Sequence, residues 1–144
     1  EPTTGLDPQT RKSVWDSVRA LQRDTGLTVF LTTHYMEEAA EADYVVVIDG
    51  GRIAAKGTPT QLRAQYASDR LKLLPSDEEG LVRKLRELRV QFERVSDQLV
   101  VRIGSTMDAL PLLGAAEPFI SGFEVLAGTM DDAFIGITGR EIRP

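Results

Sequence analysis

The 144-residue chain has 42% hydrophobic and 27% charged residues and a formal net charge of −5. These values are ordinary for globular proteins, and no apolar run approaches the roughly 20 residues that span a bilayer, so we expect a soluble chain. The acidic balance argues against a broad nucleic-acid-binding face, which needs Lys and Arg over a continuous patch. The lack of cysteine excludes disulfides and thiolate metal sites, and the single histidine, His34, cannot form a zinc site alone.

The first predicted elements are a long helix and a buried strand. Asp7 fits the N-cap position and Pro8 the first helical position, while Gly26 fits the left-handed position that ends a helix. Residues 27–33, LTVFLTT, form an apolar, β-branched run without alternation. Such a run is typical of a strand buried on both faces of a parallel sheet.

A second helix, a second buried strand and a hairpin follow along the chain. Residues 36–42, MEEAAEA, favour a helix with two acidic residues in its first turn, and residues 44–49, YVVVID, predict the strand. The adjacent glycines of DGGR tolerate the positive φ angles of a tight turn, so we expect a hairpin that leads into residues 52–57. A capping box from Thr58 to Gln61 opens a further helix.

The sequence changes character near residues 68–70, which divides it into predicted domains of residues 1–68 and 69–144. In the second domain, short strands and helices follow the order β-α-β-β-α-β with a trailing helix, as in a ferredoxin-like sandwich. The predicted strands are RLKLL (70–74), VQFERV (90–95), LVVRI (99–103) and ISGFEVL (120–126), and the predicted helices begin at a capping box of Ser76–Glu79, at Ser105 and at Thr129.

One basic cluster lies on the first predicted helix of this second domain. It contains Arg83, Lys84, Arg86 and Arg89, with apolar residues between them. A solvated helix face is the favoured interpretation, and a docking patch is the alternative.

Three separated segments match one family in order and spacing: EPTTGLDP at 1–8, TTHYMEEAAEADYVVVIDGGRIAAKGTP at 32–59 and TMDDAFIGITGREI at 129–142. They resemble the ATPase subunits of ABC transporters, and more narrowly the subfamily that drives drug and lipid exporters with a separately encoded membrane subunit. The first two segments are highly specific, and the last is characteristic but weaker. The resemblance implies an α/β fold: part of a P-loop NTPase sheet in residues 1–68, followed by a small α+β accessory domain.

The resemblance also implies roles for particular residues. Glu1 would act as the general base or polarise the attacking water, and His34 would be the switch histidine that contacts the γ-phosphate of ATP. These types suit the chemistry, because phosphoryl transfer depends on positioning and charge, and imidazole can donate to phosphate at neutral pH. Gly5, Leu6 and Asp7 would belong to the D-loop at the interface of two nucleotide-binding domains. For Asp7, this role is compatible with capping the helix.

Several parts of the family's ATP site are absent from these residues: the phosphate loop, the glutamine that links to the membrane subunit, the signature loop and the magnesium-binding aspartate. We therefore expect ATP and Mg²⁺ to bind only to the full-length subunit, with no metal held and no ATP hydrolysed by these residues alone. The implied partners are a second ATPase subunit, as a homodimer, and an integral membrane permease, with no nucleic acid. The implied location is peripheral, on the cytoplasmic face of the cell membrane.

Two other classes of protein share parts of this pattern. An interaction or regulatory module, with residues 69–144 as its active part, has no reason to retain EPTTGLDP and His34. A DNA-repair or chromosome-structure ATPase shares these loops but lacks a tail such as YVVVIDGGRIAAKGTP.

Overall fold

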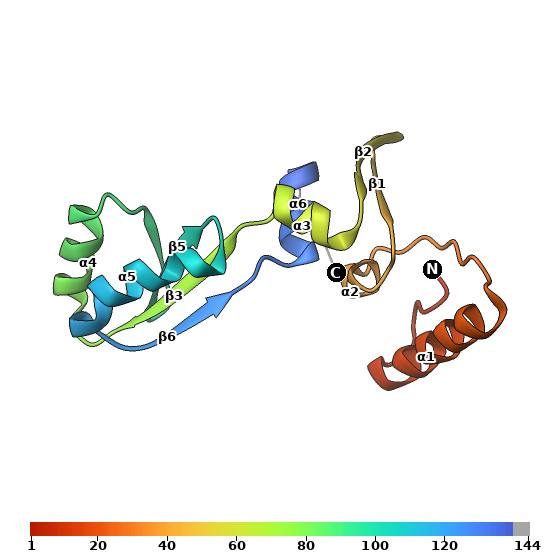
Figure 1. The fold of residues 1–144 in the computed structure, drawn as a ribbon, viewed down its shortest axis with the longest axis horizontal. Helices are drawn as coiled ribbons and strands as arrows, with labels where there is room; N and C mark the ends of the chain where they lie inside the picture. The colour runs from red at the N-terminus through yellow and green to blue at the C-terminus, as the bar shows by residue number, and fades with distance from the viewer. Residues whose placement is uncertain (140–144) are drawn as a thin grey trace. The chain divides into compact units, whose positions relative to one another are not determined.

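The computed structural model describes residues 1–139, so residues 140–144, which end both the predicted second domain and the TMDDAFIGITGREI segment, lie outside the described residues. Over the described residues the chain is a mixed α/β protein with two antiparallel sheets (Figure 1). It divides into two compact units, residues 1–39 and the residues from Ala40 onward. None of the helices in residues 1–139 is both long and apolar enough to cross a bilayer.

The first unit contains helix α1, Pro8–Thr25, and most of helix α2, Met36–Ala40. Asp7 caps α1 with Pro8 in its first turn, and Gly26 ends it in the left-handed conformation with φ +68°. Both caps are confirmed as predicted. Each one satisfies backbone groups that a helix end leaves unpaired.

The strand predicted at residues 27–33 is wrong, since this segment has no regular secondary structure. Phe30 is 90% exposed and Leu27 is 47% exposed. A strand exists only where its backbone pairs with a neighbour, and this segment pairs with no strand of residues 1–139. The apolar run alone therefore does not make a strand.

A two-stranded hairpin opens the second unit. Strand β1, Val45–Asp49, pairs antiparallel with β2, Arg52–Gly57, and the turn uses Gly50 and Gly51 at φ +58° and +75°. The predicted hairpin is confirmed, but the burial predicted for its first strand is wrong. Only Val47 of β1 is buried, because the sheet of this hairpin has two strands and leaves one face open.

The hairpin is followed by helix α3, Pro59–Tyr66, whose predicted capping box is confirmed. The Gln61 N–H donates to the Thr58 hydroxyl at 3.2 Å, and the Thr58 N–H donates to the Gln61 side-chain oxygen at 3.0 Å.

The larger sheet has four antiparallel strands: β3 (Asp69–Pro75), β4 (Phe92–Val95), β5 (Gln98–Ile103) and β6 (Ile120–Leu126). They lie in the order β4-β5-β3-β6. Helices α4, Glu78–Glu87, and α5, Ala109–Ala116, contribute to the core beside the sheet. The core is formed by alternate residues of the strands and one face of each helix, including Leu71, Leu73, Leu81, Leu85, Leu99 and Val101.

Two details of these helices differ from the prediction. The N-cap of α4 is Asp77, whose carboxylate accepts the Gly80 N–H at 3.0 Å. The capping box predicted from Ser76 is therefore wrong: the cap lies one residue later, and Gly80 at the N3 position has no side chain to complete a box. Ser105 instead caps a short 3₁₀ turn, Thr106–Asp108, and α5 begins directly after it. Pro111 lies in the first turn of α5, where its missing N–H removes no helix hydrogen bond.

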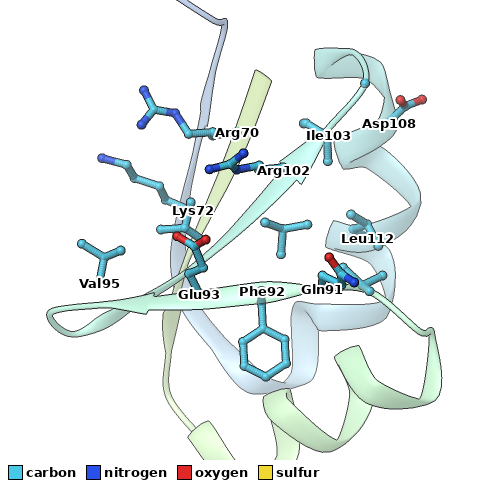
Figure 2. A pocket seen from close by; sticks show the side chains of 14 residues that line it. Arg70, Lys72, Gln91, Phe92, Glu93, Val95, Arg102, Ile103, Asp108 and Leu112 are labelled. Atoms are coloured by element: carbon cyan, nitrogen blue, oxygen red, sulfur yellow. The ribbon is translucent and has the colours of Figure 1, made fainter. Parts of the chain in front are cut away.

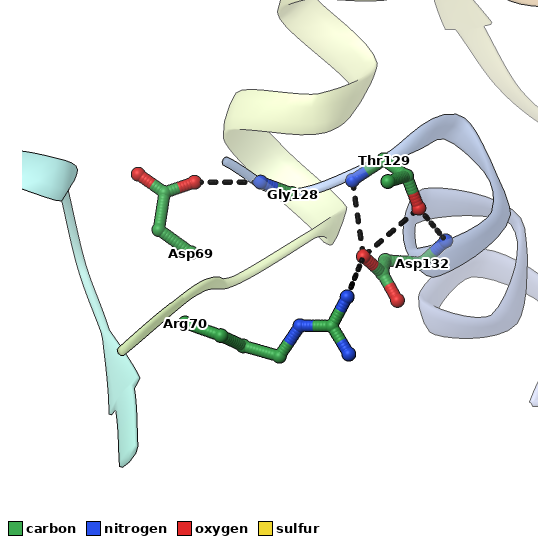
Figure 3. Close-up of polar contacts among 5 residues, drawn as sticks. All are labelled: Asp69, Arg70, Gly128, Thr129 and Asp132. Carbon is green, nitrogen blue, oxygen red and sulfur yellow. Dashed lines mark hydrogen bonds and ion pairs between the residues drawn. The ribbon is translucent and has the colours of Figure 1, made fainter. Parts of the chain in front are cut away.

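The last helix, α6, covers Met130–Thr138 and packs against α3. Figure 3 shows how the start of β3 holds the segment that leads into α6: Asp69 accepts the Gly128 N–H at 2.8 Å, and Arg70 lies 3.4 Å from Asp132. The predicted cap at Thr129 is confirmed, and Asp132 completes a capping box with it that was not predicted. The first two residues of β3, Asp69 and Arg70, thus connect the four-stranded sheet to the start of α6.

Candidate functional site

Glu1 and His34 lie together although 33 positions separate them in the sequence. His34 Nδ1 is 3.0 Å from Glu1 Oε1, and both side chains are about half exposed. Because an ionised carboxylate can only accept, Nδ1 carries the hydrogen in this contact. The hydrogen bond from His34, together with the charge that His34 carries when protonated, lowers the pKa of Glu1 below its ordinary value.

The predicted D-loop residues form a turn between Glu1 and α1. The Leu6 N–H donates to the Thr3 carbonyl at 3.1 Å, and Gly5 occupies the turn at φ +79°, a conformation that glycine adopts without strain. Asp7 Oδ1 accepts the N–H groups of Gln9 and Thr10, both at 3.0 Å. The capping role of Asp7 is confirmed, and its role at an interface stays a prediction.

Asp7 is held as a carboxylate by its own helix. The Thr10 hydroxyl donates to Asp7 Oδ2, and this hydrogen bond, followed by those from the backbone, lowers the pKa of Asp7. Both oxygens of Asp7 are therefore already engaged within the first unit.

A buried glutamate, Glu38, contacts the segment near Glu1 through Thr3 and helix α1 through Trp15. Its side chain accepts the Thr3 hydroxyl and, at 3.0 Å, the Trp15 indole N–H. Thr3 is completely buried and Glu38 is only 7% exposed. Sequence reasoning placed Glu38 only in the first turn of a helix, since nothing in MEEAAEA distinguishes the buried glutamate from its exposed neighbour Glu37.

Arg11 supplies the positive charge near Glu38. Its guanidinium lies 4.2 Å from the centre of the Tyr35 ring, and it forms an ion pair of 3.6 Å with Glu37. Burial raises the pKa of Glu38, but hydrogen bonds from Thr3, Thr33 and Trp15 and the charge of Arg11 outweigh burial and lower it overall. Glu38 is therefore an ionised, buried carboxylate at neutral pH.

Arg83, Lys84 and Arg86 of the basic cluster lie on α4, whereas Arg89 lies in the turn after this helix, and the cluster has the exposure of a solvated surface. Arg83, Arg86 and Arg89 are exposed, and the half-buried Lys84 forms an ion pair with Glu87 at 3.3 Å.

A separate hollow of about 1020 Å³ lies against the four-stranded sheet (Figure 2). Arg70, Lys72 and Arg102 line it together with Glu93, and Arg70 and Arg102 are directly opposite each other in the register of β3 and β5. No residue of the first unit lines this hollow, so it is not part of the Glu1–His34 site.

Comparison with known proteins identifies the family. No protein-family model matches the chain. The chain is 40% identical over 150 residues to the daunorubicin/doxorubicin resistance ATP-binding protein DrrA of Streptomyces peucetius, an alignment that covers 97% of this chain and 45% of that protein. It is 37% identical over 147 residues to the Nod factor export ATP-binding protein I of Cupriavidus pinatubonensis, with 99% and 44% covered.

A third relative shares a shorter segment. The energy-coupling factor transporter ATP-binding protein EcfA1 of Clostridium novyi is 50% identical over 62 residues, which cover 43% of this chain and 22% of that protein. The chain is thus related over nearly its whole length to the ATP-binding proteins of ABC transporters, and the family indicated by its motifs is confirmed. Although nearly the whole chain aligns with these two relatives, it spans less than half of their length.

Proposed function

We propose that this chain is part of the ATP-hydrolysing subunit of an ABC exporter, which couples ATP hydrolysis to transport across a membrane. The observation that carries the proposal is the contact between Glu1 and His34, one in EPTTGLDP and the other in TTHYMEE. The similarity to a drug-resistance and a Nod factor export ATP-binding protein supports the exporter assignment.

In this proposal Glu1 orients the water that attacks the terminal phosphate of ATP. A carboxylate that accepts a hydrogen bond from water positions it for in-line attack and increases its nucleophilicity. The lowered pKa keeps Glu1 ionised but weakens it as a base. While the contact with His34 is kept, Glu1 is therefore better suited to orienting and polarising water than to removing a proton completely.

His34 would donate a hydrogen bond to the terminal phosphate. With Nδ1 donating to Glu1, the other ring nitrogen, Nε2, can donate only when the imidazole is doubly protonated. Otherwise His34 must leave Glu1 to reach the phosphate. Half of the His34 side chain is exposed, so the ring is accessible to protonation from solvent and also has room to move away from Glu1.

The residues of this chain fit one end of an ATP site. Glu1 and His34 suit the attacking water and the terminal phosphate, whereas Mg²⁺ requires several oxygen ligands. Within residues 1–139, no three His, Asp or Glu side chains gather closely enough to hold a metal ion. We therefore assign the binding of Mg²⁺ and of the remaining phosphates to other parts of the complete subunit. On this assignment, the 144-residue chain alone neither binds nor hydrolyses ATP.

The same proposal assigns partners and a location. The complete subunit would pair with a second copy through the D-loop, Gly5 to Asp7, and would dock on an integral membrane permease at the cytoplasmic face of the membrane. Residues 1–68 would be the ATPase part, and residues 69–144 a ferredoxin-like accessory domain. The strand order β4-β5-β3-β6, with all neighbours antiparallel, supports the ferredoxin-like assignment.

The competing proposal is a regulatory or interaction module whose active part is residues 69–144. The self-contained core of the four-stranded sheet favours it, but it gives the Glu1–His34 contact no purpose. Calorimetry with ATP and Mg²⁺ and a hydrolysis assay separate the two. We expect the complete subunit to bind and hydrolyse ATP. Micromolar binding by the 144-residue chain alone would contradict the site assignment, and a complete subunit without hydrolysis would contradict the function.

A further inference from the structure

We propose that Glu38 is a positioning residue for the hydrolysis reaction: its buried carboxylate fixes Glu1 and His34 relative to each other. This inference rests on the proposed function of Glu1 and His34. Glu38 touches neither of them, and it acts through the segments that carry them.

The first step of the argument is the path from Glu38 to Glu1. Thr3 lies two residues after Glu1, is completely buried, and donates its hydroxyl to Glu38. Glu38 lies four residues after His34, in a helix whose first turn is formed by the Tyr35 carbonyl accepting the Glu38 N–H at 3.1 Å. The Thr3–Glu38 hydrogen bond therefore links the segment of Glu1 directly to the segment of His34.

The second step compares this buried link with the exposed one. The Glu1–His34 contact is half exposed, and ion pairs at such positions contribute about 0–1 kcal/mol because water and salt screen them. A buried, charge-assisted hydrogen bond is stronger, and its loss leaves a desolvated charge without its donor. The spacing of Glu1 and His34 therefore depends more on Glu38 than on their own contact.

The third step is the contribution of α1. Trp15, in the middle of this helix, donates its indole N–H to Glu38 Oε1, the same oxygen that accepts from Thr3. Two donors from two segments meet at one atom. The carboxylate thus holds the turn of residues 3–6, helix α1 and helix α2 in one arrangement.

The fourth step is the charge near His34. Arg11, which helps to keep Glu38 ionised, stacks on the Tyr35 ring, and the Tyr35 and His34 rings have their centres 4.3 Å apart. Without the negative charge of Glu38, the positive charge of Arg11 would lose one of the carboxylates that balance it. Arg11 lies over the Tyr35 ring, which in turn contacts the His34 ring. The same substitution thus disturbs both sides of the catalytic pair.

The test uses Glu38→Gln and Glu38→Ala, with Glu37→Gln as the matched control. Glu37 lies one position earlier in the same helical turn, and its side chain is 83% exposed. Trp15 is the only tryptophan of the chain, so its indole N–H gives a single nuclear magnetic resonance signal. In the 144-residue chain, we expect this signal to move upfield and exchange faster in both Glu38 variants, and to stay unchanged in Glu37→Gln.

In the complete subunit, we expect Glu38→Ala to lower kcat for ATP hydrolysis by about 10- to 100-fold, because small misplacements of reacting groups have effects of this size. The KM for ATP should remain nearly unchanged, and Glu38→Gln should recover part of the rate. Thr3→Val removes one donor and keeps the shape, and Trp15→Phe removes the other donor together with part of the indole. Both should give smaller losses, and they serve if Glu38→Ala does not fold.

The outcomes separate this inference from the function on which it rests. If the complete subunit hydrolyses ATP and folded Glu38 or donor variants keep the wild-type kcat, the positioning role is wrong and the function stands. An indole signal that ignores Glu38→Ala would also overturn the inference. If the wild-type complete subunit shows no hydrolysis, the proposed function itself fails, whatever the indole signal shows.

Discussion

Replacing Gly136 by alanine should weaken the packing of α6 against α3. Gly136 lies inside α6, and a Cβ at this position would be 2.3 Å from the Tyr66 carbonyl oxygen. This is about 1 Å shorter than an ordinary van der Waals contact. The atom in the way is backbone at the end of α3, so the helices must separate rather than a side chain rotate.

Two effects of opposite sign decide the magnitude. Forcing an extra methyl group into a packed interface costs about 1–3 kcal/mol, whereas exchanging glycine for alanine inside a helix contributes about 1 kcal/mol of stability. Their difference is a net loss of up to about 2 kcal/mol. The matched control is Gly114→Ala in the interior of α5, where no atom lies within 4 Å of the added Cβ. That change should stabilise the chain by about 0.5–1 kcal/mol.

Urea denaturation followed by circular dichroism measures both variants, and hydrogen exchange of the α3 and α6 amides locates the effect. We expect opposite signs for the two substitutions, with faster exchange in α6 only for Gly136→Ala. If Gly136→Ala stabilised the chain as much as Gly114→Ala does, the close packing of α6 on α3 would be wrong.

Further predictions concern α1, the pH dependence of stability and the contrast between His34 and Arg86. Asp7→Ala should destabilise α1 by about 1 kcal/mol through loss of its cap, measured by urea denaturation, and an unchanged midpoint would contradict the capping role. Glu38 has a pKa lowered from 4.5, so its stabilising contribution is complete above that value and is lost as the pH falls through the lower folded-state pKa. Denaturation between pH 7 and pH 3 should therefore show a smaller acid-induced loss in Glu38→Gln than in wild type, and equal losses would refute this assignment. In the complete subunit, His34→Ala should stop ATP turnover while Arg86→Ala leaves it nearly unchanged, and the reverse pattern would move the chemistry to residues 69–144.

The features that the sequence predicted correctly are those with local causes. The caps at Asp7, Gly26 and Thr129 and the Gly50–Gly51 turn each depend on a few neighbouring residues whose chemistry is visible in the sequence. The contact between Glu1 and His34 brings together two residues that the family motifs had singled out, although local pattern alone could not have paired them.

The features that were missed depend on what lies beside a segment in space. The run at residues 27–33 has the composition of a buried strand, but a strand needs a partner, and composition does not supply one. The burial of Glu38 was missed for the same reason. Its donors Thr3 and Trp15 come from residues 35 and 23 positions away, and adjacent glutamates in a helix look alike until those donors are placed.

The most direct test of the proposed function is steady-state ATP hydrolysis by the complete subunit carrying Glu1→Gln, with ATP binding measured on the same protein. The amide keeps the shape of the side chain but cannot act as a base, and it orients water less well than a carboxylate. We expect turnover to fall by at least the roughly 10²–10⁴-fold that general-base catalysis contributes, with ATP binding retained. Wild-type turnover in Glu1→Gln would contradict the assignment of Glu1 to the reaction and, with it, the function proposed for this chain.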